Sequence, residues 1–316
     1  MKNRDSFRGT SIDKTFAQSF KKSRFYNDIY RKHKDEIIIG VRDGSVNLYY
    51  NCDSIASIKV GSPQQCKIDK YYTNGEKKNL TEEEIVHYYE TIKANSNKRN
   101  KLEKQSQQRI YVDNNKNKSS KWFCIDVEYT KSLKGKKSAE DWRFDIIAIS
   151  KEKPFRVALI ELKYGFAAIG GKSGIRKHVE DFHKFYRDKK FDILKPELIS
   201  IIEKLCMLGV DVPLSLKGLK TEDITAEPEF YFIVLNNNPS GRSKNTPKQT
   251  TSGYLFNDKR WGCKKVSKSV TEKGDYYDLI ENDDSFKPIF LFSKAKLPDL
   301  QIHDVLDKKY YEVETI

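Results

Sequence analysis

The segment RFDIIAISKEKPFRVALIELKYG (residues 143–165) holds two apolar runs separated by the short polar stretch KEKPF (151–155). Short connections favour antiparallel neighbours, so the segment predicts a β-hairpin. If the turn is centred on Lys153, directly opposed residues lie at equal distances from it along the chain. This register places Asp145 opposite Glu161 on one face, with β-carbons about 5 Å apart.

Lys163 points to the same side as Glu161, because side chains alternate along a strand. Two carboxylates as close as Asp145 and Glu161 repel each other unless a cation lies between them. Glu128, near the end of the preceding run KWFCIDVEYT (121–130), can come alongside Asp145 and add a third oxygen donor. Such an oxygen-rich site suits Mg²⁺ or Mn²⁺, with water and substrate phosphate as further ligands.

The run 121–130 itself predicts a strand with one face in the core. We expect Asp126 to be a solvent-side residue outside the set of metal ligands. Strict alternation assigns four residues to each face: Phe123, Ile125, Val127 and Tyr129 to the core, and Trp122, Cys124, Asp126 and Glu128 to the other face.

Asp145 is followed, after fifteen intervening residues, by Glu161-Leu162-Lys163. These residues lie on the predicted hairpin, which a helix and another strand follow. This pattern resembles the PD-(D/E)xK nuclease superfamily. The resemblance covers about residues 118–238, and Phe144 stands where the name of the motif has proline. It implies a restriction-endonuclease-like fold that hydrolyses phosphodiester bonds. Asp145 and Glu161 are then metal ligands and Lys163 positions or activates the attacking water. Glu128 resembles the extra acid that many members supply.

A further candidate, His178, lies one turn into the helix predicted over about 174–188. It is either a structural residue beside the core-facing Ile175 and Phe182 or a group that reaches the scissile phosphate. His183 is expected on the solvated face of the same helix.

Two basic clusters are candidates for contact with nucleic-acid phosphates, and an ordinary basic surface is an equally good interpretation of each. One stands at a helix start and the other in the loop 131–142. Their members are Lys172, Ser173, Arg176 and Lys177, and Lys131, Lys134, Lys136 and Lys137.

The N-terminal part of the chain has a different pattern. DEIIIGVRDGSVNLYYNCDSIASIKV (35–60) predicts a small antiparallel meander, and Thr81 with Glu84 forms a capping box that starts a helix at about 82. The basic continuation KANSNKRNKLEKQSQQR (93–109) is either a solvated helix, which we favour, or a surface that meets phosphates. DNNKNKSS (113–120) is expected to be a loop.

These patterns predict an α/β (α+β) fold with a mixed central sheet, in which an antiparallel three-strand meander is flanked by helices. A second helix is expected from Pro196 to Gly209, and strands at FYFIVLNNN (230–238) and IFLFS (289–293). The expected division is a small β-rich N-terminal domain (1–78), a basic helix and linker (79–117), and a nuclease-like domain with a C-terminal extension (118–316).

The formal net charge of +14 and pI near 9.3 favour a polyanionic partner such as nucleic acid. The five cysteines are scattered without C-x-x-C spacing, which favours a reducing setting over a disulfide framework or zinc site. No apolar run approaches the length of a membrane span, so we expect a soluble, cytoplasmic protein without membrane contact. The N-terminal domain is a candidate surface for a homodimer or a protein partner.

Two other function classes compete with a Mg²⁺-dependent nuclease acting on DNA. A nucleotide-binding loop would need G-x-x-x-x-G-K-[S/T], but the residue five places before Gly171 is Phe166, so ELKYGFAAIGGKSG (161–174) fails in every register. A nucleic-acid- or partner-binding module on an inactive nuclease fold is the stronger rival, although no motif residue is lost. Restriction, antiphage defence and repair are all open as biological settings.

Overall fold

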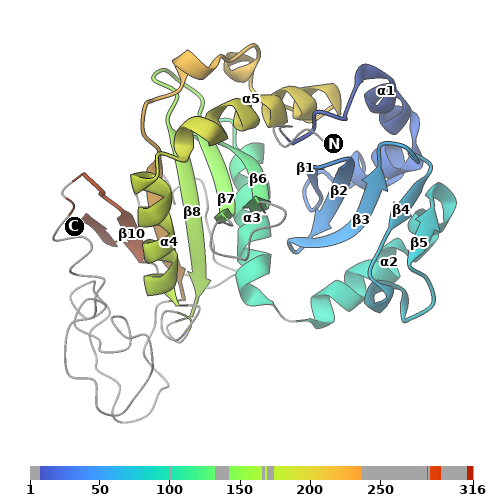
Figure 1. Cartoon of the computed structure of the whole chain (residues 1–316). Coiled ribbons are helices and arrows are strands. Elements are labelled where there is room, and N and C mark those ends of the chain that lie inside the picture. Colours follow the sequence, from blue (N-terminus) through green and yellow to red (C-terminus); the bar gives the residue numbers. More distant parts are fainter. Residues whose placement is uncertain are drawn as a thin grey trace, which may run out of the picture.

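Two β-sheets, of five and six strands, lie side by side with helices packed around them (Figure 1). The computed structural model describes residues 8–99, 101–131, 142–165, 168, 174–236, 283, 285–292 and 312–315. The general α/β class predicted from the sequence is confirmed. The finer assignment to a restriction-endonuclease-like fold stays a prediction.

The N-terminal sheet is the antiparallel meander expected over residues 35–60, extended by two short strands. Helix α1 (Lys14–Lys22) and the π-helical turn η1 (Phe25–Tyr30) precede it. The strands follow in spatial and chain order: β1 (Ile38–Arg42), β2 (Ser45–Tyr50), β3 (Asp53–Lys59), β4 (Gln65–Lys67) and β5 (Asn79–Thr81). A short 3₁₀ helix, η2 (Lys70–Thr73), lies between β4 and β5.

Helix α2 (Glu82–Lys98) begins with the predicted capping box, since Glu84 N donates to Thr81 Oγ1 and Thr81 N donates to the Glu84 carboxylate. The solvated continuation that we favoured is wrong in its second half, which folds as helix α3 (Leu102–Lys116) and buries Gln107 and Gln108. Gln108 Nε2 donates to Glu36 O at 2.7 Å and its Oε1 accepts from Cys52 N at 3.0 Å, so the side chain of Gln108 is buried because backbone groups of the N-terminal region pair with it.

The expected loop at 113–120 is also partly wrong, because α3 continues to Lys116. Asn114 is buried there and its Nδ2 donates to Trp122 O at 2.9 Å. This side chain holds the end of the helix against the first strand of the second sheet.

The central sheet is mixed, as predicted. Its strand order is β11-β10-β9-β8-β7-β6, and β6, β7 and β8 form the expected antiparallel meander. Strand β9 pairs in parallel with both β8 and β10, whereas β11 is antiparallel to β10. The strands are β6 (Trp122–Lys131), β7 (Trp142–Ser150), β8 (Val157–Tyr164), β9 (Glu229–Leu235), β10 (Ile289–Phe292) and β11 (Glu312–Thr315).

The β7–β8 register is the predicted one. Ile146 lies opposite Ile160 and Ile149 opposite Val157, pairs that are equally distant from Lys153. Val157 and Leu159 face one hydrophobic cluster while Ala158, Ile160 and Leu162 face another, so the predicted faces of this strand are confirmed too.

The crossover from β8 to β9 contains helices α4 (Ile175–Arg187) and α5 (Phe191–Met207), followed by the 3₁₀ turns η4 (Leu214–Leu216) and η5 (Thr221–Asp223). Helix α4 matches the prediction for 174–188. Helix α5 ends before Gly209, as expected, and that glycine has a left-handed φ of 85°. Its predicted start is wrong, because α5 begins at Phe191 and Pro196 lies inside it.

Strand β6 departs from the alternation expected of it. The pairing with β7 shifts between Cys124 and Asp126, so Ile125 is an extra residue in a β-bulge. Val127 therefore packs in the cluster opposite to that of Phe123, Ile125 and Tyr129, and Asp126 is buried at 1% exposure. The solvent-side position expected for Asp126 is wrong.

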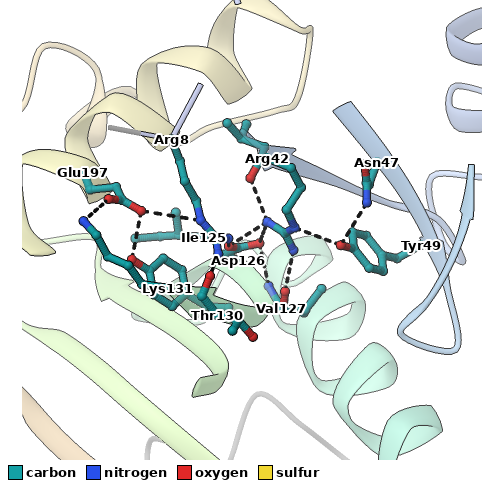
Figure 2. Close-up of polar contacts among 12 residues, drawn as sticks. Arg8, Arg42, Asn47, Tyr49, Ile125, Asp126, Val127, Thr130, Lys131 and Glu197 are labelled. Atoms are coloured by element: carbon teal, nitrogen blue, oxygen red, sulfur yellow. Dashed lines mark hydrogen bonds and ion pairs between the residues drawn. The ribbon is translucent and has the colours of Figure 1, made fainter. Parts of the chain in front are cut away.

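Two arginines surround the buried Asp126 carboxylate (Figure 2). Arg42 Nη1 lies 2.8 Å from both carboxylate oxygens, and its Nη2 donates to Val127 O at 2.7 Å. Arg8 Nη1 donates to Asp126 Oδ2 at 3.3 Å, and Arg8 Nε lies 3.5 Å from Glu197 Oε1 on α5. The network joins the N-terminal segment, β1, β6 and α5 through a single strand of the central sheet.

The hydrophobic core follows the same connection. One cluster is continuous from α1 and the N-terminal sheet to the face of the central sheet that α4 and α5 cover. A second cluster lies on the opposite face, where residues of α3 pack against the sheet. The domain boundaries near 78 and 117 stay predictions. Among the residues that the structure describes, no helix combines the length and apolar character that a membrane crossing requires.

We expect Asp126→Ala to lower the free energy of unfolding by about 3–5 kcal/mol, because it leaves the mostly buried Arg42 guanidinium without its counter-ion and Arg8 with Glu197 alone. Urea denaturation measures the loss. The matched control is Asp211→Ala, which removes an exposed partner of Lys34 and should cost less than about 1 kcal/mol. Equal losses in the two variants would contradict this role for Asp126.

Candidate active site

The polar end of the β7–β8 hairpin carries the residues that the sequence singled out. The backbone pairing of the two strands ends with Ile146 opposite Ile160. Directly beyond it, Asp145 Oδ2 accepts a hydrogen bond of 2.7 Å from Leu162 N. This bond holds the Asp145 carboxylate against the backbone between Glu161 and Lys163, as the register predicted.

Glu161 is the centre of the cluster and is 3% exposed. Its Oε1 accepts from Lys163 Nζ at 2.7 Å and lies 3.0 Å from His178 Nε2 on α4. Ile175 and Val179 of α4 pack into the core, which brings the half-buried His178 to the same side of the sheet. The structure thus brings together Asp145, Glu161, Lys163 and His178.

The two carboxyl groups have raised pKa values. Burial raises the pKa of Asp145 to about 7, against the opposing effects of the Leu162 N–H and the Lys163 charge. Burial also raises the pKa of Glu161 well above its usual range, and the negative charge of Asp145 adds to the rise. Both shifts mean that the folded protein disfavours the ionised form of each acid, chiefly because the acids are withdrawn from water.

Lys163 keeps its proton in this setting. Burial acts to lower the pKa of the ammonium group, but the charges of Glu161 and Glu103 outweigh burial and raise it. Glu103 Oε1 lies 3.8 Å from Lys163 Nζ. At neutral pH the side chain is therefore a cation and a hydrogen-bond donor.

Glu128 lies level with Asp145 in the β6–β7 pairing, between Val127 opposite Ile146 and Tyr129 opposite Phe144. Its backbone has a left-handed φ of 49°, and its Oε2 lies 3.4 Å from Lys104 Nζ on α3. Its charge is close enough to add to the rise in the pKa of Asp145. Glu128 nevertheless forms an ion pair with Lys104, and the role of Glu128 as a metal ligand stays a prediction.

Sequence reasoning missed Glu103 and Lys104, which α3 brings to the edge of the site. They stand in a polar segment without hydrophobic period, so no pattern marked one side of it as facing the hairpin. The expectation that this segment is solvated hid both contacts.

The predicted phosphate contacts are only partly within the described residues. Lys177 is exposed and pairs with Asp181 one turn along α4. Arg176 lies in the first turn of the same helix, but its side chain is outside the described part of the structure. Lys131 is held by Glu197 at 2.7 Å. Outside the described residues altogether are Lys134, Lys136, Lys137, Lys172 and Ser173.

The solvated position expected for His183 is wrong. Its side chain is buried, with Nε2 2.7 Å from Asp283 Oδ2 and the ring against Phe286. A segment far along the chain covers this face of α4, which the helical period alone does not reveal.

Asp145 and Glu161 are the two neighbouring acids at the end of the hairpin that could bind one divalent cation together. Within the described ranges, no group of three or more His, Cys, Asp or Glu side chains has the arrangement of a metal site. Mg²⁺ is commonly held by one or two carboxylates, with water and substrate phosphate as the other ligands. The raised pKa values of the pair fit such an ion, because a bound cation would favour the ionised form of both acids.

No model of a known protein family, no curated protein and no solved structure matches the chain. The functional inference therefore depends on the hairpin geometry, the neighbouring side chains and their charge states.

We expect Asp145→Asn to be more stable than the wild-type protein at pH 8 without divalent cations, by about 1–3 kcal/mol after allowance for partial exposure. A carboxyl whose pKa is raised on folding binds its proton more tightly in the folded state. Its contribution is therefore favourable at low pH and is lost as pH rises from about 4 through about 7.

Urea denaturation at pH 4 and pH 8 measures this difference, which should close at the lower pH. Asp211→Asn is the control, because Asp211 is exposed and lies outside the site. A gap between Asp145→Asn and wild type that is unchanged by pH would contradict the raised pKa.

Proposed function

We propose that the protein is a Mg²⁺- or Mn²⁺-dependent hydrolase that cuts phosphodiester bonds in nucleic acid, with DNA as the favoured substrate. The observation that carries the proposal is the pair of carboxylates, Asp145 and Glu161, held side by side at the end of one hairpin with Lys163 bonded to Glu161. A single acid–lysine pair is common in proteins. A partly exposed and a buried acid with raised pKa values beside a charged lysine is the less common arrangement.

Each side chain has a role that follows from its surroundings. Asp145 and Glu161 would hold the cation, which when bound polarises the phosphate and lowers the pKa of bound water. Lys163 retains its proton, so it positions the attacking water or a phosphate oxygen by donating a hydrogen bond and does not serve as a general base. Of the two roles expected for this lysine, the charge state favours positioning.

His178 supports Glu161. Its Nε2 lies 3.0 Å from the same oxygen that accepts from Lys163, so the carboxylate is fixed from two directions. This contact favours a positioning role over direct contact with the scissile phosphate.

The wider setting belongs to the same proposal. The net charge of +14 suits a nucleic-acid partner, and the described cysteines are all free thiols, which suits the cytoplasm. Restriction or antiphage defence is a biological setting in which such a nuclease acts, and a homodimer or protein partner would engage the N-terminal sheet.

The test incubates purified protein with plasmid and single-stranded DNA and RNA, with Mg²⁺, with Mn²⁺ and with EDTA. We expect divalent-dependent cleavage that falls at least about 100-fold in Asp145→Ala and in Lys163→Ala. Lys153→Ala is the matched lysine control, because Lys153 is 74% exposed in the turn at the other end of the hairpin, and it should cleave like wild type.

Intact substrates with both metals would overturn the hydrolase proposal. If the wild-type protein nevertheless retains nucleic acid on a gel, and the two site variants retain it equally, the function is that of a binding module on an inactive fold.

We expect His178→Ala to lower kcat about 10-fold with little change in KM, because Glu161 loses one of its two positioning contacts. His178→Gln keeps a donor and should recover part of the loss. A change confined to KM would instead indicate that His178 contacts substrate.

A further inference from the structure

A group of cations gathers where α2 meets α3, around the buried carboxylate of Asp53. Arg99 Nη1, Lys101 Nζ and Lys104 Nζ lie 3.6, 3.4 and 3.8 Å from the same oxygen, Asp53 Oδ1. All three cations share the Asp53 carboxylate, and Lys104 also pairs with Glu128 at 3.4 Å, but each of the three side chains is still about a third exposed. This corner therefore offers positive charge to an anion in solution.

An exposed aromatic ring lies beside these cations. Tyr71 of η2 is 43% exposed, and the Arg99 guanidinium carbon is 5.1 Å from the centre of its ring. Arg99 also donates to Tyr72 Oη at 2.5 Å, and Asn95 Nδ2 donates to Tyr71 O at 3.3 Å. The ring is thus presented by a backbone that α2 holds in place.

Leu102, at the start of α3, is 37% exposed next to Lys101. Among the residues that the structure describes, only four large hydrophobic side chains are exposed, and Tyr71 and Leu102 are two of them. Their occurrence beside three cations distinguishes this corner from an ordinary solvated basic surface, where apolar groups gain nothing from exposure.

The corner is continuous with the candidate active site. Lys104 Nζ lies 3.4 Å from Glu128 Oε2 as well as near Asp53, and the adjacent Glu103 reaches Lys163. A nucleic-acid backbone whose phosphates contact Lys101 and Lys104 would therefore run along the start of α3 toward the end of the hairpin that carries Asp145.

We propose that Tyr71, Arg99, Lys101, Leu102 and Lys104, the α2–α3 corner, bind an unpaired segment of the nucleic-acid strand that enters the active site. The cations contact the phosphates, while Tyr71 and Leu102 contact base faces. Duplex DNA keeps its base faces stacked inside, so it uses the cations but not the exposed ring. This assignment rests on the proposed nuclease function and adds the strandedness of the substrate.

The experiment measures fluorescence anisotropy of a labelled 20-nucleotide single strand and of the matching duplex with the full-length protein in EDTA, where no divalent cation supports cleavage. We expect tighter binding of the single strand. Tyr71→Ala should weaken single-strand binding about 5- to 50-fold and change duplex binding less than 2-fold, whereas Tyr71→Phe, which keeps the ring, should bind like wild type.

Salt dependence tests the cations. Lys101→Ala should weaken binding of both substrates and reduce the slope of log affinity against log salt by about one cation's contribution. Lys32→Ala is the control, because Lys32 is an exposed lysine that pairs with Asp28 away from the corner, and it should leave affinity and slope unchanged. Circular dichroism of each variant checks that the fold is intact.

Three results would each overturn the single-strand assignment. They are duplex binding as tight as single-strand binding or tighter, an unchanged single-strand affinity in Tyr71→Ala, and competition by the polyanion polyglutamate as effective as competition by unlabelled single strand. Because binding is measured without hydrolysis, its failure is distinguishable from failure of the proposed activity. If single-strand binding does not depend on Tyr71 but the wild-type protein cleaves nucleic acid, only the assignment of the α2–α3 corner is refuted. If binding depends on Tyr71 but no cleavage occurs, only the hydrolase proposal is refuted.

Discussion

The burial of two neighbouring acids, Asp145 and Glu161, at the end of the β7–β8 hairpin is the constraint on which the site depends. The register of Ile146 opposite Ile160 brings Asp145 and Glu161 to the same end of the hairpin, and the Leu162 N–H holds the Asp145 carboxylate against β8. Burial then makes the pair costly, as the raised pKa values of both groups show. Such a cost is tolerated at sites where a cation or substrate relieves it, which is why the pair favours function over a merely structural interpretation.

The rest of the fold supports this hairpin from two sides. On one face α4 brings His178 to Glu161, and on the other α3 brings Lys104 to Glu128 and Glu103 to Lys163. The N-terminal sheet is joined to β6, the strand that carries Glu128, through Arg42. The Arg42 side chain bonds the Asp126 carboxylate and Val127 O, immediately before Glu128. Glu128, whose backbone is left-handed, follows directly after these two buried contacts, so the position of that acid depends on docking of the N-terminal sheet.

Local pattern was sufficient to predict the elements whose environment is set by neighbours in sequence. The hairpin register, the faces of β8, the capping box at Thr81 and the span of α4 all follow from alternation, helical period or cap chemistry. Wrong expectations involve partners distant along the chain: Asp126 is buried by Arg8 and Arg42, Gln108 by backbone groups of the N-terminal sheet, and His183 by Asp283. A polar side chain reveals its burial only when its partner is known, and the bulge at Ile125 moves Val127 to the face opposite to the one that strict alternation assigns to it.

The most direct measurement of the central claim is anomalous diffraction from crystals of the full-length protein soaked in Mn²⁺ at neutral to mildly alkaline pH. The account predicts a single strong peak bonded to carboxylate oxygens of both Asp145 and Glu161, with Lys163 still within hydrogen-bond distance of Glu161. It also predicts that the peak is absent from Asp145→Asn crystals soaked in the same way. Well-ordered wild-type carboxylates with no peak between them, at Mn²⁺ concentrations in the millimolar range, would contradict the assignment of this hairpin end as a cation site.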